Sequence, residues 1–370
     1  MTVKRLGWQS VRVQLSASVA SDRPFYVAIG AYVVLALAYM AASGHLHPGD
    51  LSSTFSSYVQ LWILDNVLVF PLLFLMLAYI RITLRLNTRR NLAYRKLFSP
   101  VAVGRFLAGA LMMAAFVPFR TMFNSVKNAI PEASGFIWDR TLADIDQALH
   151  FGKAPWEWLY ATLRHPAVLR AIEVNYETIW FVICFGVQYW VAVSPLFDRI
   201  RLRYMLCFVL CWVIIGNVSA TLISSAGPIY YGLVTGDFHR FADLMTFTAS
   251  SAGQFAATTD FQAYLWQLHA SELPGLGSGI SAFPSMHVAA IVMNALFLIE
   301  TSRRWVIPAA LYVVFVLVSS VYLGWHYAID GYASILMTAG IFYGLKWAMA
   351  QKWRLWPTRR EAVAAVVAQD

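Results

Sequence analysis

Apolar segments of about 20 residues recur along this chain, and they restrict its fold more than any other feature. A helix of that length crosses the roughly 30 Å hydrocarbon layer of a bilayer. Inside that layer every backbone N–H and C=O group must be bonded internally, which helices achieve. Of the 370 residues 59% are hydrophobic and 13% are charged, about half the charged fraction of a soluble domain. We therefore expect an all-α polytopic membrane protein.

The apolar pattern predicts about eight transmembrane helices. We expect them at 25–43, 59–80, 101–118, 178–194, 204–224, 284–301, 305–323 and 328–349. Two long loops separate some of these segments, at 119–177 and 225–283. The first loop alternates Trp and Leu with charged residues, a pattern typical of amphipathic helices lying on the membrane surface.

The basic residues indicate the orientation. If the N-terminal segment lies inside, 20 of the 28 Lys and Arg residues fall on the inner side and seven on the outer side. Inner loops carry an excess of basic residues, so we expect both termini in the cytoplasm. Topology also explains the net charge of +9 better than nucleic-acid binding does, and we expect no nucleic-acid partner. The expected location is a bacterial inner membrane.

Two short stretches contain the residues best suited to chemistry, SAFPSMH at 281–287 and GWHYAID at 324–330. His326 and Asp330 are one helical turn apart, so the carboxylate can orient the imidazole. His287 follows a Pro-Ser turn that opens an apolar segment. The expected topology places all three on the outer, periplasmic side. Ionisable groups at a membrane edge are costly to place, which makes a functional role the first hypothesis.

A His–Asp pair with a second His permits double displacement at phosphorus. His326 can attack the phosphorus atom while Asp330 holds its tautomer and stabilises the cation. His287 can protonate the leaving oxygen. Ser285 and the backbone N–H groups of the helix that it opens can bind phosphoryl oxygens. Basic side chains for the phosphate must come from elsewhere in the chain.

Other interpretations of these residues remain open. Two His and one Asp can form a metal site, although no fourth ligand lies nearby in the sequence. A transporter could also use the ionisable cluster, but transporters usually hold such groups near the bilayer midplane within inverted repeats. His45 and His47 share an outer loop with Asp50, and this pattern is typical of solvated surface. The GLGSG segment at 275–279 is interpreted as a flexible approach to the site.

SAFPSMH followed by GWHYAID resembles the second and third signatures of the type-2 phosphatidic acid phosphatase superfamily. More narrowly, the chain resembles the inositol phosphorylceramide synthase-like (inositolphosphotransferase) branch. The resemblance implies a six-helix phosphatase-type core. It also implies that the third-signature His is the nucleophile, its Asp partner the orienting residue and the second-signature His the general acid. The segment SAGPIYYG resembles that branch too, and adds Gly227, Pro228 and Tyr230 to the expected substrate-binding residues.

The chain departs from the superfamily pattern at several positions. Ser319 and Ser320 stand where the soluble-type phosphatases have Ser-Arg. Arg120 and Lys127 have the spacing of the first signature in reversed order, and they are the basic residues expected to bind phosphate. Met286 replaces the usual Gly before the His. These changes favour a lipid phosphotransferase over simple hydrolysis of phosphomonoesters.

We therefore expect a membrane-embedded lipid phosphate phosphatase or phosphotransferase. It would pass the phosphoryl or phospho-head group to water or to a lipid alcohol, with membrane lipids as partners and without a metal or nucleotide cofactor. The alternatives are a polyprenyl-diphosphate phosphatase and a non-enzymatic membrane transporter. The expected organisation is a basic cytoplasmic tail (1–24), N-terminal transmembrane helices (25–118), an outer amphipathic loop (119–177), a catalytic membrane core (178–349) and a cytoplasmic tail (350–370).

Overall fold

The fold is described by a computed structural model, which places residues 2–85 and 89–352. The C-terminal tail predicted from residue 350 onward therefore lies almost entirely outside the described residues. Within the described ranges the chain forms helices and no β-strand. The predicted all-α polytopic membrane fold is confirmed.

The helices follow one another with short connections. The α-helices of the first half are α1 (Thr2–Ser21), α2 (Arg23–Ala42), α3 (Pro48–Ile63), α4 (Phe70–Arg85), α5 (Arg90–Leu97), α6 (Pro100–Ala114), α7 (Phe116–Ser134), α8 (Asp139–Leu149), α9 (Pro155–Leu163), α10 (Pro166–Val174) and α11 (Trp180–Val193). Those of the second half are α12 (Arg201–Val213), α13 (Ala220–Leu222), α14 (Tyr231–Thr235), α15 (Ala242–Thr248), α16 (Thr258–Ala270), α17 (Met286–Thr301), α18 (Val306–Tyr322) and α19 (Ala328–Lys352).

Seven helical segments of the described chain are long and apolar enough to cross a membrane. They are Arg23–Ala42, Pro48–Arg85, Pro100–Glu132, Pro166–Val193, Arg201–Leu222, Arg303–Tyr322 and Ala328–Gln351. The eighth predicted crossing corresponds to α17, which is apolar but has only 16 residues. At 1.5 Å per residue α17 is about 24 Å long, shorter than the hydrocarbon layer. The residues that precede α17 are not helical.

The third apolar segment continues beyond the predicted end at residue 118. Helix α7 follows α6 after one turn residue, Ala115, and extends to Ser134. Hydropathy falls along α7 because several of its side chains are polar, including Arg120, Thr121 and Asn124. All three are buried inside the protein. A polar stripe that faces other helices lowers the average hydropathy without ending the helix.

Three of the long apolar segments contain a π-helical turn, at Leu64–Val69, Asn175–Ile179 and Ile214–Ser219. A π-turn inserts one residue into a helix and redirects the side chains around it, and such turns are frequent at functional sites. The second of them lies between α10 and α11 and carries residues that contact the candidate site.

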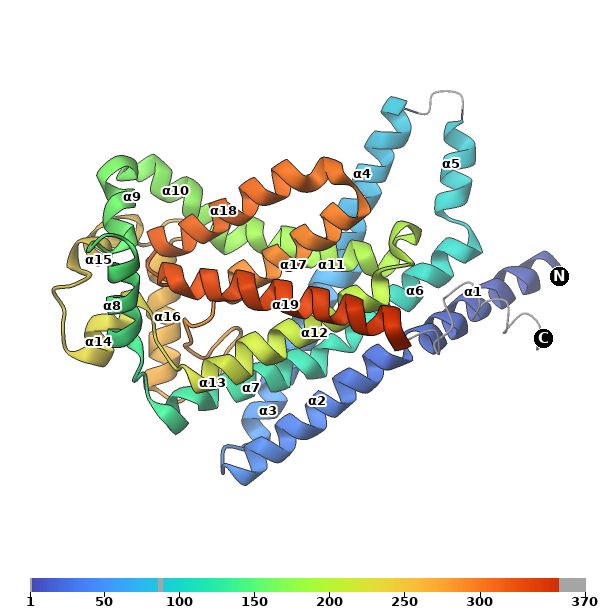
Figure 1. The fold of residues 1–370 in the computed structure, drawn as a ribbon. Coiled ribbons are helices and arrows are strands. Elements are labelled where there is room, and N and C mark those ends of the chain that lie inside the picture. Colours follow the sequence, from blue (N-terminus) through green and yellow to red (C-terminus); the bar gives the residue numbers. More distant parts are fainter. Residues whose placement is uncertain (1, 86–88, 353–370) are drawn as a thin grey trace.

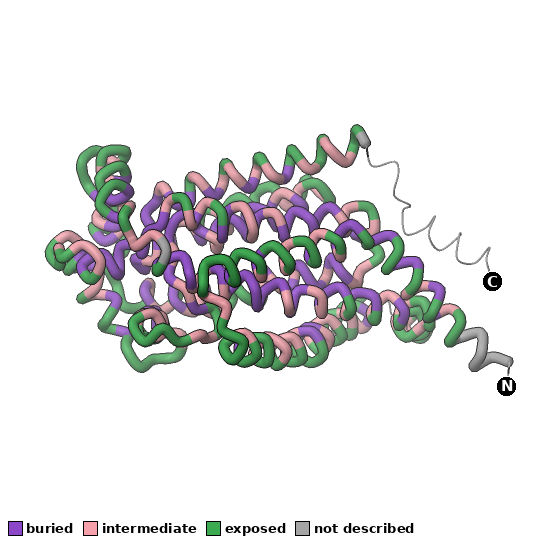
Figure 2. Tube along the Cα trace, turned by 90° about the horizontal axis from the view of Figure 1, so that it is seen from below, coloured by how far each residue is buried: buried purple, intermediate pink, exposed green. Residues whose placement is uncertain are grey.

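The long helices form a bundle whose two ends differ. Helix α17 packs against α12, α18 and α19, while α7 packs against α2 and α3. Figure 1 shows the short helices α8, α9, α14, α15 and α16 gathered at one end, and the start of α1 with the end of α19 at the other. Figure 2 shows buried residues concentrated in the inner helices and exposed residues along the outer ones. Large exposed apolar residues on α4, such as Leu72 and Leu84, match a surface that faces lipid.

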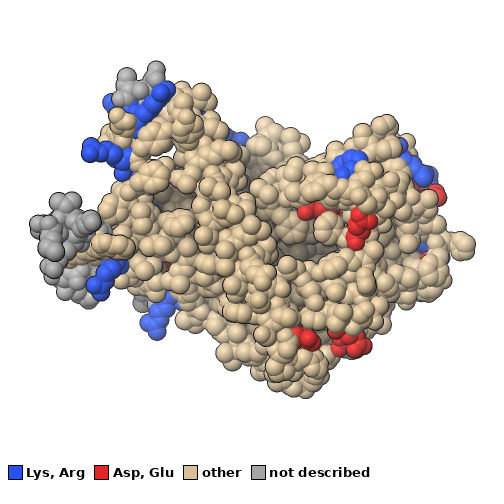
Figure 3. All heavy atoms as spheres, turned by 180° about the vertical axis from the view of Figure 1, so that it is seen from behind, with Lys and Arg blue, Asp and Glu red and all other residues tan. Residues whose placement is uncertain are grey.

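Charge is distributed unevenly between the two ends. Figure 3 shows many of the visible Lys and Arg side chains toward the end of the bundle where α1 begins and α19 ends, and acidic side chains toward the other end, beside a hollow. The short surface helices belong to this second end (Figure 1).

Candidate functional site

His326 and Asp330 meet at the start of α19. The Nδ1 atom of His326 lies 3.3 Å from Oδ2 of Asp330, and the backbone N–H of Tyr327 donates to the same oxygen at 3.0 Å. His326 is 7% exposed and Asp330 is fully buried. His326 precedes the helix and Asp330 lies in its first turn, so the carboxylate also binds a free N–H group at the helix N-terminus. The ring is thereby held with Nε2 available for chemistry.

His287 lies in the first turn of α17 and is held between aromatic rings. Its imidazole stacks on Tyr176 with 4.3 Å between ring centres, and the Trp180 ring is 4.2 Å away. Trp180 also donates a hydrogen bond of 3.1 Å from Nε1 to the backbone carbonyl of His287. The ring centre of His287 is 6.5 Å from that of His326. Within the described residues the buried Nε2 of His287 has no hydrogen-bond partner.

Ser285 joins the two segments that carry the histidines. It is fully buried and caps α17, where its Oγ accepts a hydrogen bond from the N–H of Val288 at 3.4 Å. Its own N–H donates to the backbone carbonyl of Asp330 at 3.3 Å. The SAFPSMH and GWHYAID stretches are therefore connected directly through their backbones.

The loop that contains Gly227 and Pro228 packs against the chain just before His326. Gly227 has a φ of +96°, and a Cβ atom there would lie 2.6 Å from the backbone oxygen of Trp325. The N–H of Ile229 donates to the carbonyl of Gly324 at 3.0 Å, and Pro228 begins a short 3-10 turn. These contacts fix the backbone that leads into His326.

Tyr230 follows in the same 3-10 turn, but its side chain contacts helix α16 and not the two histidines. Its hydroxyl donates to the backbone carbonyl of Gln262 at 2.9 Å, and its ring stacks on Trp266. Both partners belong to α16. Tyr230 thus attaches this loop to a surface helix.

Substituting Gly227 by alanine is expected to destabilise the protein by at least about 2 kcal/mol, because an L-residue is strained at this φ and its Cβ would collide with backbone. The midpoint of thermal unfolding in detergent measures this effect. Gly340→Ala is the matched control, since a Cβ at Gly340 meets nothing within 4 Å; it should leave the midpoint unchanged or raise it slightly. Equal midpoints for the two variants would contradict the assigned role of Gly227.

Of the two basic residues predicted to bind phosphate, the structure brings one close to the histidines. Lys127 lies near enough to His287 for its charge to act on the imidazole. Arg120 lies two turns earlier on α7, stacked over the Phe185 ring at 4.4 Å and donating to Oε1 of Gln188 at 3.4 Å. Arg120 therefore points into a different layer of the bundle.

Helix α8 supplies a carboxylate that the sequence analysis missed. Asp139 is fully buried and accepts hydrogen bonds from the N–H groups of Ala226 and Gly227 at 2.7 and 2.8 Å and from the hydroxyl of Tyr327 at 2.8 Å. Burial raises the pKa of Asp139 to about 6, and the three hydrogen bonds act in the opposite direction. Asp139 connects the loop before Pro228 to the residue after His326.

A second buried carboxylate lies two turns further along α8. Asp146 accepts hydrogen bonds of 3.0 Å from the N–H groups of Ala328 and Ile329, the first residues of α19. Burial raises its pKa, and these two bonds oppose that shift. The spacing of Asp139 and Asp146 puts both on one helix face, and this signal was available in the sequence.

Glu177 is a third missed residue, and it lies in the π-turn beside Tyr176. Its Oε1 accepts hydrogen bonds of 3.0 Å from Nε1 of Trp325 and from the hydroxyl of Thr258. It therefore fixes the residue immediately before His326. Placing an acidic residue at the start of an apolar segment costs free energy. The position of Glu177 in the sequence was therefore a signal of a structural or functional role.

Within residues 2–85 and 89–352, no three His, Cys, Asp or Glu side chains are arranged to hold a metal ion. The alternative in which His287, His326 and Asp330 are metal ligands therefore has no support from the donor geometry.

Comparison with known proteins gives one match. A family model described as the PAP2 superfamily matches residues 140–344, more than half of the chain, and the matched range includes both histidines and Asp330. Neither the comparison with curated proteins nor the comparison with solved structures gave a match.

Proposed function

We propose that this chain, which belongs to the PAP2 superfamily, is a membrane enzyme that cleaves a lipid phosphoester with His326 as the nucleophile. Members of the superfamily are phosphatases. The observation that supports this most strongly is the convergence of His326, its partner Asp330 and His287, with 6.5 Å between the two imidazole centres. Metal-independent phosphoryl transfer requires such a nucleophile, an orienting carboxylate and an acid.

The proposed reaction proceeds in two displacements. In the first, Nε2 of His326 forms a bond to phosphorus while the bond to the leaving oxygen breaks, and that oxygen takes a proton from His287. Asp330 accepts the hydrogen bond of the Nδ1–H group and stabilises the positive ring. In the second, His287 removes a proton from water or an alcohol, whose oxygen attacks phosphorus and releases His326. Atoms and charge balance over the two steps.

The charges near the site favour a phosphodiester substrate and transfer of its head group. Among the residues that the structure describes, Lys127 is the cation whose charge acts on His287. Ser319 and Ser320, which stand where soluble-type relatives have Ser-Arg, donate to the carbonyls of Phe315 and Leu317 within their own helix. A phosphodiester carries one negative charge and a phosphomonoester nearly two at neutral pH. A single lysine matches the first better, which supports the inositolphosphotransferase-like reading.

The proposed location of the reaction is the outer membrane surface, with both termini in the cytoplasm. This proposal rests on the basic residues at the end of the bundle where α1 begins and α19 ends (Figure 3) and on the excess of Lys and Arg that inner loops carry.

The substrate class is tested with purified enzyme in lipid nanodiscs, supplied with a head-group-labelled phosphodiester lipid or a phosphomonoester lipid. We expect transfer of the labelled phospho-head group to an added lipid alcohol, detected by mass spectrometry of the lipids, and slower release of free phosphate from the monoester. Release of phosphate from the monoester alone would identify a hydrolase, such as a polyprenyl-diphosphate phosphatase. Absence of any product from either lipid would reject the proposal.

A further inference from the structure

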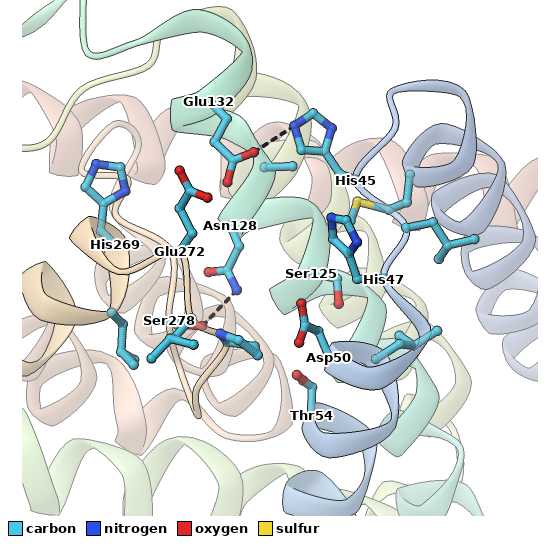
Figure 4. Close-up of a pocket in the computed structure, with 18 of the residues that line it drawn as sticks. His45, His47, Asp50, Thr54, Ser125, Asn128, Glu132, His269, Glu272 and Ser278 are labelled. Atoms are coloured by element: carbon cyan, nitrogen blue, oxygen red, sulfur yellow. Dashed lines mark hydrogen bonds and ion pairs between the residues drawn. The ribbon is translucent and has the colours of Figure 1, made fainter.

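A cavity of about 280 Å³ is lined by residues of α3, α7, α16 and the loop that follows α16, including Ser278 and Gly279 (Figure 4). It is enclosed by the turn between α2 and α3, the second half of α7, the end of α16 and the loop that follows. Its size is at the lower end of the range for small-molecule sites. His47 and Asp50 are exposed, as the sequence interpretation of solvated surface predicts, and together with the half-buried His45 they also line this cavity.

The lining of the cavity is acidic. Asp50, Glu132 and Glu272 face it, and no Lys or Arg is among the described residues that line it. Glu132 pairs with Nε2 of His45 at 2.8 Å, whereas Asp50 and Glu272 form no salt bridge with any described residue. Burial lowers the pKa of His269, and the charges of Glu132 and Glu272 oppose that shift. The cavity therefore repels a phosphate and attracts a cation.

One hydroxyl that lines the cavity makes no hydrogen bond within the described part of the chain. Thr54 is 5% exposed and lines the cavity, and Figure 4 shows its side chain beside Asp50. No hydrogen bond joins its hydroxyl to any residue in the described part of the chain. The hydroxyl oxygen is not among the fully buried unpaired atoms, so it is open to the cavity and available to a molecule bound there. A ligand with hydrogen-bonding groups would satisfy it.

The cavity is connected to the candidate site through α7 and the following loop. Lys127 lies near His287, and the next residue, Asn128, lines the cavity and donates to the hydroxyl of Ser278 at 2.9 Å. Gly279 packs directly against Lys127, and from there the chain leads to His287. An occupant of the cavity would therefore lie beside a phosphate held at Lys127.

We propose that this cavity binds an ammonium-bearing alcohol, which serves as the acceptor of the phospho-head group. The carboxylates Asp50 and Glu272 bind the ammonium group, and Thr54 bonds to a hydroxyl. The acceptor role rests on the proposed function, whereas binding in the cavity does not.

The experiment measures binding by titration calorimetry in the His326→Ala protein in nanodiscs, so that no turnover interferes. The probes are glucosamine, glucose and inorganic phosphate, of which the first two differ mainly in one ammonium group. We expect saturable binding of glucosamine, at least about tenfold tighter than that of glucose. We also expect that inorganic phosphate does not displace glucosamine.

The double variant Asp50→Asn, Glu272→Gln should weaken glucosamine binding by at least about tenfold and leave glucose binding unchanged. Thr54→Val should weaken both sugars. Asp243→Asn is the matched control, because this exposed carboxylate on α15 does not line the cavity, and it should bind glucosamine as the parent does. A thermal unfolding midpoint equal to the parent's verifies that each variant is folded.

Equal affinity for glucosamine and glucose would overturn the ammonium assignment, and absence of binding by any probe would overturn the cavity as a site. Transfer to simple lipid alcohols by the intact enzyme, with no glucosamine binding, would reject this inference while the proposed function stands. Glucosamine binding without any transfer by the intact enzyme would reject the acceptor role.

Discussion

Replacing His326 by alanine is expected to lower turnover by at least about 10³-fold, with the protein still inserted and folded. The expected loss is large because the variant has no atom that can form the bond to phosphorus, and water in its place lacks the orientation that Asp330 provides. The rate of head-group transfer or phosphate release from a labelled lipid measures the effect.

Covalent trapping gives a second readout of the same prediction. Rapid quenching with ³²P-labelled substrate should leave label on the parent protein, acid-labile as expected for a phosphorus–nitrogen bond, and none on His326→Ala. His239→Ala is the matched control, because His239 is exposed and has no role in the proposed site; it should retain full activity and label. Full turnover by His326→Ala, or label that persists on that variant, would show that His326 is not the nucleophile.

Changing Asp330 to asparagine is expected to lower kcat by about 10² to 10⁴-fold, with a smaller change in KM. The asparagine has nearly the same volume, and its carbonyl oxygen can still accept the N–H of Tyr327. It cannot, however, stabilise a positive charge on His326, and its amide can present a donor to Nδ1 and so favour the wrong tautomer.

Measurement of kcat and KM together separates this role from a structural one. If Asp330 acts on the imidazole, the thermal unfolding midpoint of Asp330→Asn should stay close to the parent value while kcat falls. A loss of kcat below about tenfold, with folded protein, would show that the carboxylate does not assist the reaction. A large fall in the unfolding midpoint would assign Asp330 to helix capping instead.

Local patterns in the sequence were sufficient to predict the helical membrane fold and the proximity of His326 to Asp330. Both depend on short-range spacing, either the length of apolar segments or one turn of a helix. The end of the third segment was predicted wrongly, at residue 118, because hydropathy cannot distinguish a polar stripe buried between helices from a loop. Helix α7 continues through that stripe to Ser134.

Contacts between distant segments could not be predicted in this way. Arg120 and Lys127 are seven residues apart on one helix, and the sequence made them equivalent. Two turns of helix separate them by about 10 Å in depth, so only Lys127 lies near His287. The bonds from Asp139 and Asp146 to the loops around His326 depend on how α8 lies across the end of the bundle, and no local pattern contains that information.

The backbone bond between Ser285 and Asp330 has a consequence for substrate choice. Because it joins the two segments that carry the imidazoles, this bond limits how far the slot between the two rings can widen. Discrimination among lipids would then depend on what fits around the slot. Acyl tails of any length can remain in the surrounding bilayer, so a single enzyme of this design would tolerate a mixed population of fatty chains.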